Sequence, residues 1–217
     1  MGRFAPGLLF FALLGASAPA EAAPKVEPLG AACDGAPAGM RAFLAQGLKV
    51  SLEGGPELDL WTCKSVPVEH AEKAALGAHY ARIREGALIG VVRFLTRWKD
   101  AKGQSIAPGT YTLRYAIQPA DGNHMGVSEL RDFLVLGPVS SDSDPGAVPE
   151  RDDLYGLGRK VSLTRHPAVM GLAPVPEGAA VPGVLDLGEG EDAIAVRGGT
   201  VTLGIVVQSR ADGEAGR

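Results

Sequence analysis

The eight residues TYTLRYAI, numbers 110–117, show the most regular alternation of apolar and polar side chains in the chain. Successive side chains of a β-strand point to opposite faces of a sheet. One face of this segment would carry Tyr111, Leu113, Tyr115 and Ile117. Aromatic and branched residues with a period of two predict a strand that packs one face against a core.

Similar patterns predict further strands on both sides of this one. Residues 87–95, ALIGVVRFL, are apolar on both faces, which predicts a central strand covered from both sides. The other predicted strands are 48–53, 57–63, 78–83, 131–136 and 201–208. Two short helices are predicted, one over 36–46 and one, interrupted by glycine, over 151–162.

The segments 137–150 and 171–183 are rich in Pro or Gly and lack periodicity, which predicts loops. Short strands separated by turn signals are typical of an antiparallel β-sandwich. We therefore expect a mainly β fold, an Ig-like or jelly-roll-like sandwich with one or two short helices. Strands do not alternate with long helices, which disfavours a parallel α/β sheet.

Composition fits a single small domain. Of the 217 residues, 46% are hydrophobic and 21% charged, and 30 Gly and 16 Pro punctuate the predicted strands. The formal net charge is −4, and the basic residues form no run. The sequence therefore lacks the cluster of basic residues that binding to nucleic acid phosphates requires.

The N-terminus has the order of a secretory signal peptide. Arg3 precedes the apolar stretch 4–14, and small residues follow, with Ala18 and Ala20 at an A-x-A site. A membrane anchor is the alternative, but the stretch is about half as long as a bilayer requires. We expect a signal peptide over 1–20, with cleavage after Ala22 as the near alternative, and no transmembrane segment after its removal.

The mature chain is expected to be exported, periplasmic or extracellular. It would comprise an extended leader over 21–35, one β-rich domain over 36–210 and a polar tail over 211–217. In an oxidising compartment Cys33 and Cys63 are candidates for a disulfide. Two free thiols, one of them buried, are the alternative, because the sequence does not supply the geometry of a disulfide.

The densest polar segment is the connection 118–132, QPADGNHMGVSELRD. The candidate binding residues there are Gln118, Asp121, Asn123, His124, Arg131 and Asp132. Turn formation alone explains the Asp, Gly and Asn residues. Arg114, together with Arg93 and Arg131, is a candidate to pair with Asp132, and such pairs more often hold strands together than bind an anion.

A metal site is the alternative use of this connection. His124 would be the anchor for copper or zinc, with Met125, Asp132 or His166 as further ligands. No H-E-x-x-H or C-x-x-C spacing brings ligands together, so a hydrogen-bonded loop histidine is the competing interpretation. No cofactor other than such a metal is expected. The sequence also lacks a G-x-S-x-G nucleophile elbow.

Residues 109–138 resemble a family of uncharacterised exported bacterial proteins that share a GxYTLRY strand, a QPxDGxHxGV turn and a DF strand. The resemblance extends upstream through LDLWTCKSVP and EGALIGVVRF and weakly downstream to HPAVMGL. The matching residues are Gly109, Tyr111, Arg114, Tyr115, Gln118, Pro119, Asp121, Gly122, His124, Gly126, Asp132 and Phe133. The resemblance implies export and a β-rich domain, and it implies no activity.

We therefore expect an exported, non-catalytic sandwich that binds a partner protein or an envelope component through the 118–132 connection. A periplasmic copper- or zinc-binding protein that uses His124 is the first alternative. An enzyme acting on envelope polymers is the second, and it would need two acids that converge in a cleft.

Overall fold

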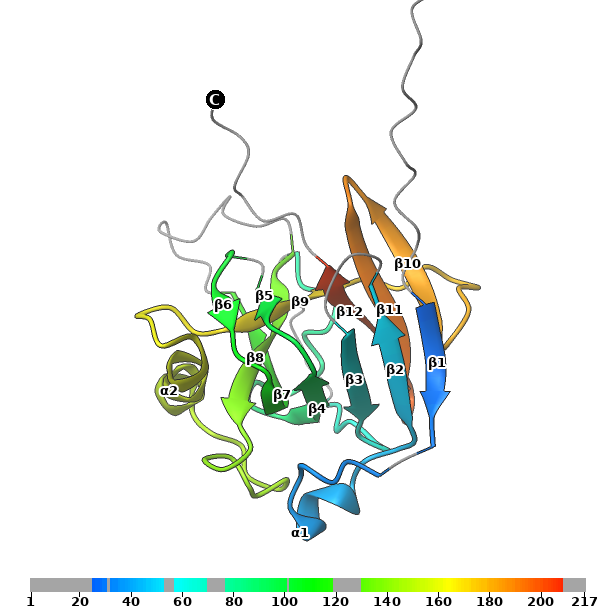
Figure 1. The fold of residues 1–217 in the computed structure, drawn as a ribbon. Coiled ribbons are helices and arrows are strands. Elements are labelled where there is room, and N and C mark those ends of the chain that lie inside the picture. The colour runs from blue at the N-terminus through cyan, green and yellow to red at the C-terminus, as the bar shows by residue number, and fades with distance from the viewer. Residues whose placement is uncertain are drawn as a thin grey trace, which may run out of the picture.

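The structure, a computed structural model, describes residues 25–30, 32–52, 57–69, 77–100, 102–118 and 130–208. Ten strands form one antiparallel sheet in the order β1-β2-β3-β4-β7-β8-β9-β12-β11-β10 (Figure 1). They are β1 (Lys25–Leu29), β2 (Gly47–Ser51), β3 (Glu57–Thr62), β4 (Leu88–Phe94), β7 (Gly109–Ile117), β8 (Asp132–Pro138), β9 (Val169–Ala173), β10 (Gly183–Gly188), β11 (Glu191–Gly198) and β12 (Val201–Gln208). The remaining elements are a two-stranded hairpin and two helices, namely β5 (Trp98–Lys99), β6 (Ser105–Ile106), α1 (Ala38–Arg41) and α2 (Arg151–Ser162).

The predicted two-sheet sandwich is wrong. The single sheet curls until it is nearly closed into a barrel, and its two edge strands, β1 and β10, lie in contact (Figure 1). The hydroxyl of Thr62 in β3 donates a 3.0 Å hydrogen bond to the carbonyl of Arg197 in β11, across the nearly closed side. The alternation of a strand shows that one face is buried, but it does not show which strands are neighbours. Here β9 pairs with both β8 and β12 and so joins what would have been two sheets.

The core lies inside the curled sheet. Tyr111, Leu113 and Tyr115 point into it from β7, as their alternation predicts. The opposite face of this region is also covered, because Leu154 of α2 is buried in a cluster with Val135 of β8. Strands β4, β7 and β8 are therefore buried on both faces.

Several local predictions are confirmed. Strands occupy the predicted 110–117 and 201–208 segments, β7 beginning one residue earlier at Gly109, and α2 covers 151–162. The helix stops at Leu163, which adopts the left-handed conformation with φ of 57°. Of the predicted 36–46 helix only α1 forms.

Other local predictions are wrong or only partly confirmed. Residues 78–83 form turns, with one isolated bridge between Ile83 and Val68, because their polar atoms bond to distant strands instead of a neighbouring ladder. The predicted loop 171–183 is confirmed over 174–182, although its first residues belong to β9 and its last to β10. Within the expected extended leader, residues 25–29 form β1, which pairs with β2. No helix of the described segments has the length and apolar character needed to cross a membrane.

Candidate functional site

The predicted binding connection is described only at its two ends. Asp121, Asn123, His124 and Met125 lie outside the described residues. At the base of the connection the backbone N–H of Gln118 donates to the backbone carbonyl of Arg131 at 2.8 Å. The Arg131 guanidinium donates to the backbone carbonyl of Gln118 at 2.6 Å. The backbone bond continues the β7–β8 pairing beyond the last residue of β7, and the side-chain bond reinforces it.

Asp132, the first residue of β8, is buried and accepts hydrogen bonds from three donors. The Tyr115 hydroxyl donates to Oδ1 at 2.6 Å, the backbone N–H of His79 to Oδ2 at 2.6 Å and that of Tyr80 to Oδ1 at 3.3 Å. Burial, followed by the hydrogen bond to Asp132, raises the pKa of Tyr115, so the phenol remains a donor. Asp132 therefore fastens the 79–80 segment to the sheet, and it does so at the end of the predicted binding connection.

Tyr80 continues this attachment on the opposite side. Its hydroxyl donates to the carbonyl of Ala173 in β9 at 2.7 Å and accepts from the N–H of Gly204 in β12 at 3.3 Å. Ala173 and Gly204 are register partners in the sheet. Burial raises the pKa of Tyr80. The hydroxyl thus completes the hydrogen bonding where β9 and β12 separate.

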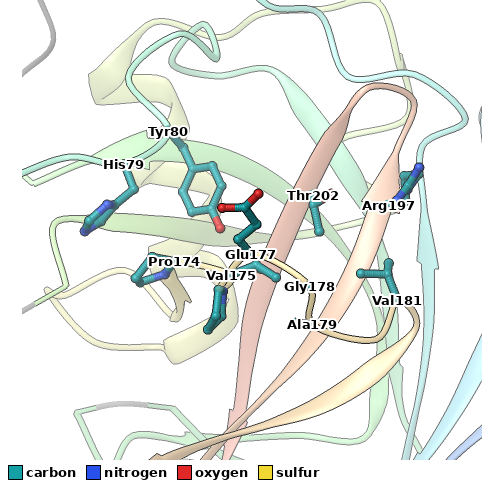
Figure 2. Close-up of a pocket in the computed structure, with 11 residues that line it drawn as sticks. His79, Tyr80, Pro174, Val175, Glu177, Gly178, Ala179, Val181, Arg197 and Thr202 are labelled. Carbon is teal, nitrogen blue, oxygen red and sulfur yellow. The ribbon is translucent and has the colours of Figure 1, made fainter.

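A pocket of about 460 Å³ lies beside this segment (Figure 2). Its wall is formed by His79 and Tyr80, by most of the 174–181 segment, and by Arg197 and Thr202. Pockets of this size hold small ligands or short peptide segments. No periodic pattern marks this pocket in the sequence, since the Pro-rich 174–181 segment has the composition of a linker.

The lining combines an apolar surface with polar groups that the fold does not use. Prolines, valines and alanine of the 174–181 segment supply the apolar part. The side chains of His79, Glu177, Arg197 and Thr202 make no hydrogen bond or ion pair with another described residue. The lining therefore includes one acidic, one basic, one imidazole and one hydroxyl side chain, with Glu177 near its middle and His79 and Arg197 at opposite margins (Figure 2).

Arg114 does not belong to this site, and its predicted pairing with Asp132 is wrong. Its guanidinium pairs with Asp142 through two parallel bonds, 2.6 Å from Nε and 2.7 Å from Nη2. The remaining three N–H groups donate to the carbonyls of Gly86, Ala147 and Asp144. All five donors of a fully buried Arg114 are satisfied by the protein, so this cation holds the 139–149 loop against β7.

The structure does not bring the two described metal candidates together. The Asp132 carboxylate is enclosed by Tyr115 and the 79–80 segment, whereas His166 is exposed after α2 and accepts from Nε of Arg165 at 3.3 Å. Among the described residues no three His, Cys, Asp or Glu side chains are grouped to hold a metal ion. The metal site at His124 stays a prediction, because His124 and Met125 lie outside the described residues.

Cys33 and Cys63 are buried and carry free thiols in the structure. Burial raises the pKa of both thiols, that of Cys63 to about 11. Neither thiol is therefore activated as a nucleophile.

No protein family, curated protein or solved structure was found to match this chain. The function is therefore argued from the site alone.

Proposed function

We propose that this protein is an exported, non-catalytic binding protein that holds a partner or an envelope component at the pocket lined by His79, Tyr80 and the 174–181 segment. One observation carries the proposal. Asp132 ends the connection and, through the backbone N–H groups of His79 and Tyr80, also positions one wall of the pocket. The described end of the predicted binding connection is therefore hydrogen-bonded to the pocket wall.

The chemistry of the lining supports binding of a ligand with mixed character. Glu177 and Arg197 carry opposite charges and form no ion pair with each other. A ligand with an amine, a carboxylate and an apolar part, such as a peptide segment, matches this arrangement. The buried groups Tyr80 and Asp132 use their hydrogen-bonding capacity within the fold, which suits a positioning role and not proton transfer.

Site-specific photocrosslinking tests this proposal without knowledge of the ligand. Benzoylphenylalanine is placed at the exposed Pro176 of the pocket, and the matched control carries it at the exposed Pro108. Irradiation of cells that produce the full chain should give a discrete adduct at 176 and none at 108.

The charges provide the second arm of the experiment. Adding Glu177→Gln and Arg197→Gln to the 176 variant should reduce the adduct several-fold, because both substitutions remove charge and keep a polar side chain. Equal adducts at 176 and 108, or an adduct at 176 that survives both substitutions, would overturn the proposal.

A further inference from the structure

A second surface, which shares no residue with the pocket, carries exposed cations from two segments. The β5–β6 hairpin with the residue before it supplies three, and the last turn of α2 and the turn that follows supply the other two. All five are exposed, namely Arg97, Lys99, Lys102, Lys160 and Arg165. We call these residues, together with Leu163, the hairpin–helix surface.

The hairpin directs its cations outward. Trp98 and Ile106 are register partners and are buried, so the alternation places Arg97 and Lys99 on the outer face. The Arg97 guanidinium donates to the Ser105 hydroxyl on that face at 3.1 Å.

Gln104 fastens the tip of the hairpin to the turn after α2. Its side-chain amide donates to the Pro167 carbonyl at 3.3 Å and accepts from the Thr164 hydroxyl at 2.5 Å. Lys102 in the hairpin tip is therefore held close to the segment that carries Lys160 and Arg165. Figure 1 shows α2 beside β6 at the same side of the molecule.

These cations are not neutralised within the described part of the chain. None of the five forms an ion pair with another described residue. The adjacent acid, Asp100, is buried, and its carboxylate accepts from the N–H groups of Lys102 and Gln104 and from the Gln104 side chain. The whole chain has a net charge of −4, so this concentration of positive charge opposes the overall balance.

Leu163 lies between Lys160 and Arg165 in the chain and is 88% exposed, far more than the other exposed large hydrophobic residues of the described chain. The turn holds it outward, because the Ser162 hydroxyl donates to the His166 carbonyl at 2.6 Å and accepts from the Thr164 N–H at 3.2 Å. An exposed leucine on an ordered turn is costly in water and favourable in an apolar phase.

We propose that the hairpin–helix surface binds anionic lipid bilayers, with the five cations at the headgroups and Leu163 inserted among the acyl chains. The five positive charges favour binding to an anionic surface. Exposed Leu163 favours a bilayer over a soluble polyanion, because only a bilayer provides an apolar phase for its side chain. This inference is independent of the pocket.

Vesicle flotation tests it, with an equimolar mixture of phosphatidylglycerol and phosphatidylcholine compared with phosphatidylcholine alone. The full-length protein should float with the anionic vesicles only. Lys160→Gln with Arg165→Gln should weaken binding about 25-fold, since each cation near an anionic surface contributes roughly fivefold. Lys25→Gln, on the exposed edge strand β1, is the matched control and should leave binding within about twofold.

Substitution of Leu163 distinguishes insertion into the lipid from electrostatic attraction alone. Leu163→Ser should weaken binding several-fold, whereas Leu187→Ser, at an exposed site on β10, should not change it. Thermal unfolding of each variant confirms that it is folded. The proposal is overturned if the protein does not float with anionic vesicles, if it binds both vesicle types equally, or if Leu163→Ser leaves vesicle binding unchanged.

Discussion

The hydroxyl of Tyr115 donates a 2.6 Å hydrogen bond to Oδ1 of Asp132, and both residues are almost completely buried. Tyr115 lies in β7 and Asp132 begins β8, so the bond crosses between the two strands that carry the 118–132 connection. Because the same carboxylate holds the N–H groups of His79 and Tyr80, the pair links the sheet to the pocket wall.

Asp132→Ala should lower the free energy of unfolding by about 3–5 kcal/mol, because it leaves the phenol and two backbone N–H groups without an acceptor. Tyr115→Phe removes one donor and should cost about 1–3 kcal/mol. Urea denaturation measures both. Amide hydrogen exchange at His79 should accelerate in the first variant and stay slow in the second, and equal exchange in both would contradict the link to the pocket wall.

Arg114→Lys should be strongly destabilising, by about 3–5 kcal/mol, because an ammonium cannot make the paired bonds to Asp142 and reach three carbonyls as well. Arg93→Lys is the matched control. Arg93 pairs with Asp59 but is one-third exposed, so its replacement should cost about 1 kcal/mol or less. Similar losses in the two variants would refute the structural role assigned to Arg114.

Gly90→Ala should cost at least about 2 kcal/mol, because the added methyl group would collide with the Trp61 carbonyl oxygen and lie 3.0 Å from the Thr62 Cα. Both contacts are backbone atoms of the neighbouring strand β3, which cannot move aside. In Gly39→Ala the new Cβ meets nothing within 4 Å, and the higher helix propensity of alanine should leave α1 unchanged or slightly stabilised. Chemical denaturation of the two variants checks the contrast.

The buried Cys63 thiol predicts a loss of stability at alkaline pH. Burial raises its pKa from 9.0 to about 11, with the nearby Arg114 charge opposing the shift. The folded state therefore holds the proton more tightly than the unfolded state, and the free energy of unfolding should fall by about 2–3 kcal/mol as pH rises from 9 to 11. The Cys63→Ala variant keeps all the other titrating groups of the protein. Its free energy of unfolding should therefore fall by about 2–3 kcal/mol less than that of the unmodified protein between pH 9 and 11.

Thiol titration accompanies that measurement. Two free thiols per denatured chain would agree with the structure, whereas none would establish the disulfide between Cys33 and Cys63 and remove the basis for the pH prediction. Identical pH profiles for the two proteins would show that burial does not raise the pKa of the Cys63 thiol.

Local chemistry was predictable where it depends on neighbours along the chain. The alternation of 110–117 and the double-sided apolar pattern of 87–95 correctly indicated β7 and β4. Residues 151–162 form α2 despite their glycines, because their apolar side chains fall on one face of the helix. That face packs on β8. The pocket had no such local signal, because its lining comes from three separated segments.

The sequence by itself determined that this chain is mainly β and where several of its strands lie, because side-chain alternation is set by the backbone geometry of each strand. Tertiary structure alone decided that the strands form one curled sheet instead of two, because β8, β9 and β12 become neighbours only through backbone hydrogen bonds between distant segments. It also decided that Arg114 meets Asp142 while Asp132 meets Tyr115. Such partners depend on which faces of the strands and loops come together, and residue order does not specify that.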